Sequence, residues 1–385
     1  MDLPALRRSL LALLGEGAAP KLEPADWQEL DRLAALHRLA PLLHAERGSD
    51  EAVPNAIRDG WRAAHRHSAI QALAIRAELE DCCALLEQAG HQPIALKGAW
   101  LSRHAYPAPA LRPMRDLDIW VPVEGVLGAY AVLLGCGYVM AEPPEMALED
   151  VVRLDKHMPP LLSSRGVVIE LHHHLWEPTG RLDHASPSAD EAAIRARAVV
   201  DPGGIRMPAP QDTLAHLIVH AVYSHRLDCG PLLLTDIDFL LRSAPIDWAR
   251  FWAEADAGNW QSGARLVLEL AQHWRPGMNI ELTGDPAPPD LLEMAPDLLL
   301  QELDTRQSAQ LAAAMLNSGP AKLLQRMLGR RSAEGEADVT RDMSHEGGAL
   351  GWAASRAWRS ASQLARGDVR RQSRQLAALS KWLGQ

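Results

Sequence analysis

The spacing of apolar residues predicts helices at both ends of the chain and strands in its middle. Residues 1 to 90 repeat apolar side chains with the period of an α-helix, most clearly over 52–89. Gly90 follows the last of these helices, in the place where glycine commonly ends a helix. The helical period returns from Gln211 onward. The pattern therefore predicts a segment with strands between two helical regions.

Short apolar runs after Gly90 predict the strands of a small mixed sheet. These runs contain β-branched residues or alternate apolar with polar positions, and both features are typical of strands. The order strand, helix, strand, helix, strand, strand indicates an α+β fold. The expected strands are 93–96, 114–121, 157–162 and 166–175, and the expected helices between them are 99–104 and 123–137.

The rest of the pattern divides the chain further. Residues 177–210 are rich in Pro, Gly, Asp and Ser and are expected to be a connection with a small excursion of structure. Two breaks interrupt the later helices, at 284–290, where three prolines prevent a continuous helix, and at 329–348. We predict an N-terminal helical segment (1–89), a core (90–200) and a C-terminal helical domain (201–385).

Composition narrows the class of protein. The chain has 385 residues, 47% of them hydrophobic and 23% charged, which is typical of a globular protein with two or three compact units. It has no run of eighteen apolar residues, and Gly15 and Glu16 interrupt the first apolar run, so we expect a cytoplasmic protein without a membrane span. A net charge of −10 disfavours nucleic acid as a partner.

Two local features carry little functional information. The four cysteines have no C-x-x-C spacing, so neither a zinc knuckle nor a disulfide framework is expected. The tail over 343–385 has seven Arg or Lys residues against two acidic residues. An amphipathic helix with a solvated basic face explains that tail more simply than contact with nucleic acid.

Two carboxylates in an apolar strand are the most informative feature. Asp116 and Asp118 are two positions apart, so on a strand they share a face, while Leu117 and Ile119 face the opposite, buried layer. Carboxylates held that close repel unless a cation lies between them. Mg²⁺ or Mn²⁺ is the usual cation, and it normally also binds substrate phosphates. A D-x-D pair alone more often has a structural role, so further residues are needed.

A lone glutamate in the last predicted strand supplies the third carboxylate. Glu170 interrupts the apolar run at 167–171, and burying it without a partner would be costly. If this strand lies beside the strand of Asp116 and Asp118, the three carboxylates form one metal centre. His172 shares the face of Glu170 and is expected to line the cleft.

Basic residues precede the aspartates. Lys97 and Gly98 stand at a predicted junction of strand and helix, where backbone N–H groups favour anions. Gly98 would let the backbone approach a phosphate, and Lys97 would add a positive charge. Arg112 could bind phosphate oxygens through its planar guanidinium group.

The histidines allow a different interpretation. His172, His173 and His174 look like a zinc cluster, but strand alternation separates His173 from the other two. His157 is expected in a neighbouring strand, facing either the same cleft or solvent. A zinc hydrolase that uses His172, His174 and His157 remains an alternative.

The later helices contain weaker candidates. His216, His220 and Tyr223 share a helical face that could line the cleft. Asp236 and Asp238 form a second D-x-D, but in a predicted helix residues two apart do not share a face. A structural role is therefore expected for the pair, and Asp236 is only a weak candidate for an acceptor or base contact.

The chain contains the run LKGAWLSRHAYPAPALRPMRDLDIWV, followed later by VVIELHHHLW. This pair of motifs resembles the uncharacterised bacterial nucleotidyltransferase-like proteins of the DNA polymerase β superfamily. The resemblance covers roughly residues 90–176. It implies a small mixed sheet of the polymerase β type, a metal centre of Asp116, Asp118 and Glu170, and phosphate binding by Lys97, Gly98 and Arg112. Many members of the superfamily carry Gly-Ser where this chain has Lys97-Gly98, so nucleotide placement is expected to differ.

The resemblance also implies a reaction. An acceptor group would attack the α-phosphorus of an NTP such as ATP and release pyrophosphate, with Mg²⁺ or Mn²⁺ as cofactor. The acceptor, a small molecule, a peptide or a protein, is left open. A second hypothesis keeps the fold without the chemistry, as a nucleotide-sensing or partner-binding module of the antitoxin type.

Overall fold

The protein is described by a computed structural model. It describes residues 1–15, 17–144, 146–177, 187–302 and 367–384, and the single positions 306, 309, 310 and 313. The chain forms two compact units, Met1–Pro288 and Pro289–Gln385. The boundaries predicted at residues 89 and 200 both fall inside the first unit. The division of the chain into 1–89, 90–200 and 201–385 stays a prediction.

A five-stranded mixed sheet lies in the first unit, in the order β1-β2-β5-β4-β3. The central pair, β2 and β5, is parallel, and the other neighbours are antiparallel. The strands are β1 (Ile94–Ala95), β2 (Asp116–Trp120), β3 (Val139–Met140), β4 (Leu161–Leu162) and β5 (Val168–His172). A separate two-stranded sheet consists of β6 (Val199–Val200) and β7 (Arg206–Met207).

The register of the central pair places the polar residues of both strands together. Asp118 is opposite Glu170, and Trp120 is opposite His172. Leu117, Ile119, Ile169 and Leu171 are fully buried on the other face. Alternation of polar and apolar positions therefore gives this pair of strands one core face and one functional face.

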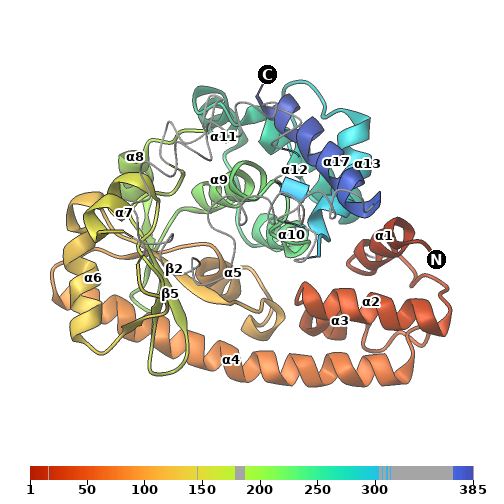
Figure 1. Ribbon diagram of the computed structural model, residues 1–385, viewed down its shortest axis with the longest axis horizontal. Coiled ribbons are helices and arrows are strands. Elements are labelled where there is room, and N and C mark those ends of the chain that lie inside the picture. The colour runs from red at the N-terminus through yellow and green to blue at the C-terminus, as the bar shows by residue number, and fades with distance from the viewer. Residues whose placement is uncertain are drawn as a thin grey trace, which may run out of the picture. The chain divides into compact units, whose positions relative to one another are not determined.

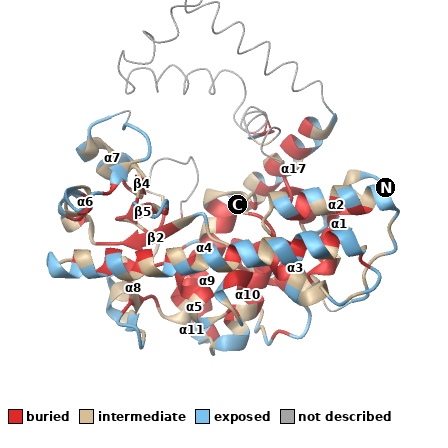
Figure 2. Ribbon diagram, turned by 90° about the horizontal axis from the view of Figure 1, so that it is seen from below, coloured by how far each residue is buried: buried red, intermediate tan, exposed pale blue. Residues whose placement is uncertain are grey.

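Helices of the N-terminal part pack beside the sheet. The longest, α4, contacts α2, α3 and α6, and Figure 1 shows it passing along the sheet toward α2 and α3. Its outer side is exposed, whereas β2 is mostly buried (Figure 2). The bounds are α1 (Leu3–Leu13), α2 (Pro24–Leu36), α3 (Ala40–Arg47), α4 (Asn55–Gln88), α5 (Gly98–His104) and α6 (Val126–Gly135).

Later helices of the first unit surround α9 and α10. Both are almost fully buried, and α10 contacts α5, the helix that follows Lys97. A π-helical turn over His220–Ser224 follows α9 directly. The bounds are α7 (Leu148–Leu154), α8 (Glu191–Arg197), α9 (Pro210–Val219), α10 (Leu232–Ser243), α11 (Trp248–Ala257) and α12 (Gln261–Trp274).

The second unit contains α13 (Pro289–Leu299) and α17 (Gly367–Leu383), which pack on each other. In α17 the buried positions include Val369, Leu376 and Leu379. The part of the predicted basic tail that is described is thus an amphipathic helix. Among the described helices, none combines the length and the apolar character that crossing a bilayer requires.

The predicted order of strands and helices in the middle of the chain is confirmed, with shorter elements. Of the strand expected over 157–162, only Leu161–Leu162 is a regular strand, and His157 forms an isolated bridge to His172. The pattern did not predict β3 or α7, whereas α8, β6 and β7 form the small excursion of structure expected within 177–210. The break at 284–290 is confirmed because α12 ends at Trp274 and α13 begins at Pro289. The break at 329–348 lies outside the described residues.

Candidate metal and nucleotide site

The functional face of β2 and β5 carries a compact polar cluster. Nε2 of His172 lies 2.8 Å from Oδ1 of Asp118 and 3.6 Å from Oε2 of Glu170. Asp118 and His172 are buried, whereas Asp116 and Glu170 are partly open. The predicted meeting of the two strands is therefore observed, and His172 joins two of the carboxylates.

Lys97 places a positive charge in this cluster. Its Nζ atom lies 2.7 Å from Oδ1 of Asp118, and both side chains are about nine-tenths buried. Lys97 precedes α5 with φ 45° and ψ −112°, a conformation in which a residue with a Cβ is strained. Strain of this kind concentrates at functional sites. Here the strained residue is the lysine that lies between β1 and α5.

The three carboxylates differ in their proton affinity. Burial, and then the charges of Asp118 and Glu170, raise the pKa of Asp116. Burial alone would raise the pKa of Asp118 too, but the Lys97 ammonium and the contact with His172 hold that pKa well below its ordinary range. The close contact with His172 lowers the pKa of Glu170. Asp118 is thus ionised. Asp116 has too little positive charge near it to offset its burial and the two neighbouring carboxylates.

The donor set suits a divalent cation. One ligand atom from each of Asp118, Glu170 and His172 lies within 4.8 Å of the others. Asp116 is not part of that group, although it stands on the same face. Among the described residues the side chain of Asp116 forms no hydrogen bond or ion pair, so its carboxylate is available as a ligand. A cation that bound these oxygens would also relieve the repulsion that raises the pKa of Asp116.

Arg112 is already engaged by a buried acid. Its Nε and Nη2 atoms donate to the two oxygens of Asp236, at 3.0 and 2.9 Å. The Tyr106 hydroxyl donates to Oδ1 of Asp236 at 2.7 Å. This network joins the loop before β2 to α10, so Asp236 has the structural role expected for the second D-x-D. Among the described residues, no acceptor takes the two N–H groups of Arg112 Nη1 or the second N–H of Nη2, so these three are left for a phosphate.

Gly98 allows close packing of the same loop. A Cβ at Gly98 would lie 2.6 Å from Sδ of Met114 and 3.1 Å from Nη1 of Arg112. A side chain there would require the Met114 side chain to move, so glycine allows this close packing without displacement. Contact between Gly98 and a phosphate stays a prediction.

The sequence profile of the uncharacterised nucleotidyltransferase family matches residues 23–276. That range covers well over half of the chain and includes every residue of the cluster described above. The chain belongs to the uncharacterised nucleotidyltransferase family. A comparison with curated proteins finds no significant match.

The histidines of this nucleotidyltransferase family member do not form the zinc site considered from the sequence. Nδ1 of His157 lies 3.0 Å from the Met158 carbonyl oxygen, and Nδ1 of His174 lies 3.2 Å from Glu191. His173 points away, with Nε2 at 3.0 Å from the Val152 carbonyl oxygen. In the described parts of the chain, only Asp118, Glu170 and His172 meet the geometry of a three-ligand site. His157 stays close to the cluster, with its ring 5.3 Å from that of His172.

Two histidines of α9 and the following turn approach the cluster from the helical side. Burial, and then the charge of Lys97, lower the pKa of His216 and of His220 well below the ordinary value, so both are neutral. Their rings are 6.1 Å apart. Tyr223 does not join them, because its hydroxyl accepts a hydrogen bond from the Gly263 N–H at 3.2 Å. That His216 and His220 line a cleft with the cluster stays a prediction.

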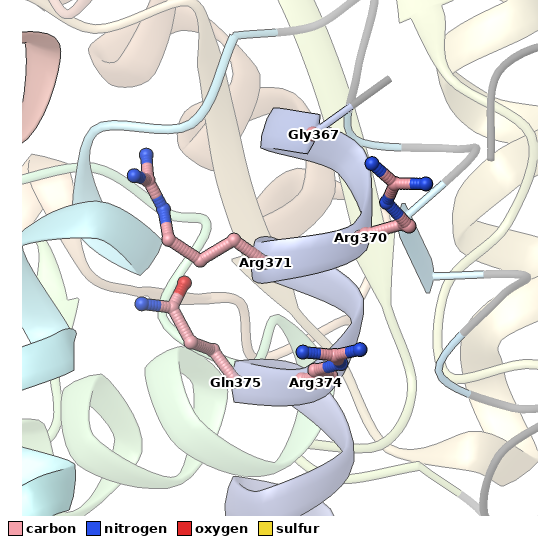
Figure 3. A pocket seen from close by; sticks show the side chains of 5 residues that line it. All are labelled: Gly367, Arg370, Arg371, Arg374 and Gln375. Atoms are coloured by element: carbon pink, nitrogen blue, oxygen red, sulfur yellow. The ribbon is translucent and has the colours of Figure 1, made fainter. Parts of the chain in front are cut away.

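A hollow beside α17 belongs to the second unit and has a different character. It is lined by Gly367, Arg370, Arg371, Arg374 and Gln375, all from one helix (Figure 3). Arg371 and Gln375 both contact Asp297. None of these described lining residues is acidic, whereas β2 and β5 carry three carboxylates, so the cluster on β2 and β5 is the candidate site of this family member.

Proposed function

We propose that the protein transfers a nucleotidyl group from an NTP to a hydroxyl or similar group of an acceptor, with release of pyrophosphate. The observation that carries this proposal is the parallel register of β2 and β5, which places Asp118 opposite Glu170 and keeps Asp116 on the same face. Membership of the nucleotidyltransferase family supports the same reaction class. The fold agrees with the polymerase β type, which we propose as its specific class.

Mg²⁺ or Mn²⁺ is the cofactor that the site would hold. Asp116, Asp118 and Glu170 offer the carboxylate oxygens that such ions prefer, and His172 supplies a nitrogen donor at the same place. When bound, the ion would neutralise charge on the phosphate oxygens and lower the barrier to displacement. The residues of the chain supply position and electrostatic stabilisation.

The proposed reaction is an in-line displacement at the α-phosphorus. The acceptor oxygen forms a bond to phosphorus while the bond from phosphorus to the oxygen bridging the α and β positions breaks. Pyrophosphate leaves with that oxygen, and one of the three carboxylates accepts the hydroxyl proton. Lys97 lies where it can exchange its ion pair with Asp118 for contact with a phosphate oxygen.

The remaining predicted residues surround the proposed nucleotide position. Lys97 and Gly98 form the turn between β1 and α5, and Arg112 keeps one guanidinium nitrogen, Nη1, on the Gly98 side. His172 and His157 stand at the strand ends on the cluster side. We assign these five residues to nucleotide binding, with Arg112 held in place by Asp236.

The products of α-labelled and γ-labelled NTPs test this reaction class. The protein is incubated with Mg²⁺, each labelled NTP and a pool of small-molecule, peptide and protein acceptors. The proposal predicts α-label on an acceptor and γ-label in pyrophosphate, both lost in Asp116→Asn/Asp118→Asn. Release of γ-label as orthophosphate would indicate phosphoryl transfer or hydrolysis instead. Nucleotide binding without transfer would favour the nucleotide-sensing alternative.

A further inference from the structure

Arg38 occupies a position where a residue with a side chain is strained. It follows α2 with φ 58°, and it is one of five non-glycine residues with positive φ in the described part of the chain. Its N–H donates to the Ala35 carbonyl, and the Leu39 N–H donates to the Ala34 carbonyl at 2.8 Å. These two bonds form a Schellman motif, whose left-handed position normally holds glycine. Local structure therefore gives no reason for an arginine here.

The side chain of Arg38 reaches the loop that leads into β2. Its Nη1 atom donates at 3.2 Å to the carbonyl oxygen of Pro113, which lies between Arg112 and Arg115 in the sequence. The Nε atom is buried, and no described residue accepts a hydrogen bond from it. A buried guanidinium donor without an acceptor is costly, so this position is suited to a bound anion.

Positive charge gathers around this guanidinium group. Burial, followed by the nearby charges of Arg115 and Arg112, lowers the pKa of Arg38 to about 10, and Asp116 and Asp236 oppose that change. Asp236 is committed to Arg112 through two hydrogen bonds. Among the described residues, neither Arg38 nor Arg115 forms an ion pair. Asp116, the other acid that acts on Arg38, forms no ion pair with either arginine in the described part of the chain.

We propose that Arg38 and Arg115 form an anion subsite that binds the β- and γ-phosphates of the NTP. The α-phosphate would lie at the carboxylate cluster, and the leaving pyrophosphate would extend toward the two arginines. Guanidinium groups suit this ligand because their planar donor pairs match the oxygens of a phosphate. The inference rests on the proposed function for the identity of the donor, but an anion subsite can be tested without a nucleoside.

Binding of tripolyphosphate with Mg²⁺, measured by calorimetry, tests the subsite. The informative variant is Arg38→Gly, because glycine relieves the positive φ while it removes the guanidinium group. We expect at least a tenfold loss of tripolyphosphate affinity, with no loss of thermal stability. Arg115→Gln should weaken binding in the same direction. Arg66→Gln, which changes an exposed arginine on α4, is the matched control and should bind like wild type.

Each outcome separates the subsite from the proposed function. Wild-type affinity in Arg38→Gly, or no binding of tripolyphosphate by wild type, would overturn the subsite. If tripolyphosphate binds through Arg38 but no NTP binds, the subsite stands and the proposed function fails. If NTPs bind and only the aspartate variants lose them, the function stands and the subsite fails. Arg38→Asn, which also tolerates positive φ, replaces the glycine variant if that variant does not fold.

Discussion

Lys97 and Asp118 form a mostly buried ion pair, with 2.7 Å between Nζ and Oδ1, and the lysine holds a strained backbone conformation to do so. The pair places a positive charge among three carboxylates before any ligand is present. Lys97 therefore acts as an internal counterion for the site. Binding of a metal ion and a nucleotide would let the ion take over part of that role.

Removing this lysine should make stability depend on metal. Lys97→Met leaves Asp118 buried without its counterion, which should cost about 3–5 kcal/mol of unfolding free energy in a chelator. Added Mg²⁺ should restore part of the loss because it supplies the missing charge. Urea denaturation with EDTA or with Mg²⁺ measures both effects. Lys21→Met removes an exposed lysine as a control, and equal losses with and without Mg²⁺ in Lys97→Met would contradict the prediction.

The carboxylate cluster should bind Mn²⁺ through residues of both strands. Glu170→Gln and Asp116→Asn each remove a carboxylate charge, and His172→Gln removes the group that contacts Asp118 and Glu170. We expect affinity for Mn²⁺ to fall by about 10- to 100-fold in the histidine variant, and by more in the carboxylate variants. Paramagnetic titration measures this directly, with the exposed Asp59→Asn as control. Unchanged affinity for Mn²⁺ in all three variants would show that the metal does not bind on this face of the sheet.

The network around Asp236 should be structural. Asp236→Asn leaves the guanidinium group of Arg112 without its acid and should destabilise the fold by about 3–5 kcal/mol. Tyr106→Phe removes one hydroxyl from the same network and should cost only about 1 kcal/mol. Urea unfolding of both variants gives the two values. A loss below 1 kcal/mol in Asp236→Asn would show that the ion pair is not needed to hold α10 against the loop before β2.

His37 should make the fold sensitive to acid. Burial, followed by the charges of Arg7, Arg115 and Arg38, lowers its pKa to about 4. The unfolded chain binds a proton at this histidine below pH 6.5, whereas the folded chain does not, so stability is full above pH 6.5 and falls as the pH drops toward 4. Between pH 7 and pH 5 the contribution is about 2 kcal/mol.

The matched variants for this pH effect are His37→Gln and His67→Gln, the second on the exposed side of α4. Unfolding free energies at pH 7 and pH 5 are compared with those of wild type. His37→Gln should reduce the difference between the two pH values, and His67→Gln should leave it nearly unchanged. Identical slopes for His37→Gln and wild type would contradict the assignment.

The two strands that carry the site could be predicted from the sequence because the alternation of polar and apolar residues within each strand is a local pattern. Leu117 and Ile119 alternate with Asp116 and Asp118, and a single polar residue, Glu170, interrupts an apolar strand. A period of two determines which side chains share a face. The meeting of the two strands was an inference from the shared chemistry and from the family resemblance, and the register confirms it.

The sequence could not show contacts between distant segments. Arg112 was interpreted as a free phosphate ligand, but it pairs with Asp236, 124 positions further along the chain. No feature of the sequence points to Arg38, because it lies far from the D-x-D in sequence and reaches the loop before β2 through the packing of the N-terminal helices. Its positive φ is a property of the folded backbone. An arginine that follows a helix in the sequence does not predict that conformation.

The central claim is tested most directly by calorimetric binding of each of the four NTPs, with and without Mg²⁺, to wild type and to Asp116→Asn/Asp118→Asn. The account predicts binding of at least one NTP by wild type that requires Mg²⁺ and is lost in the variant. Absence of binding to wild type, or binding that survives in the variant, would contradict it.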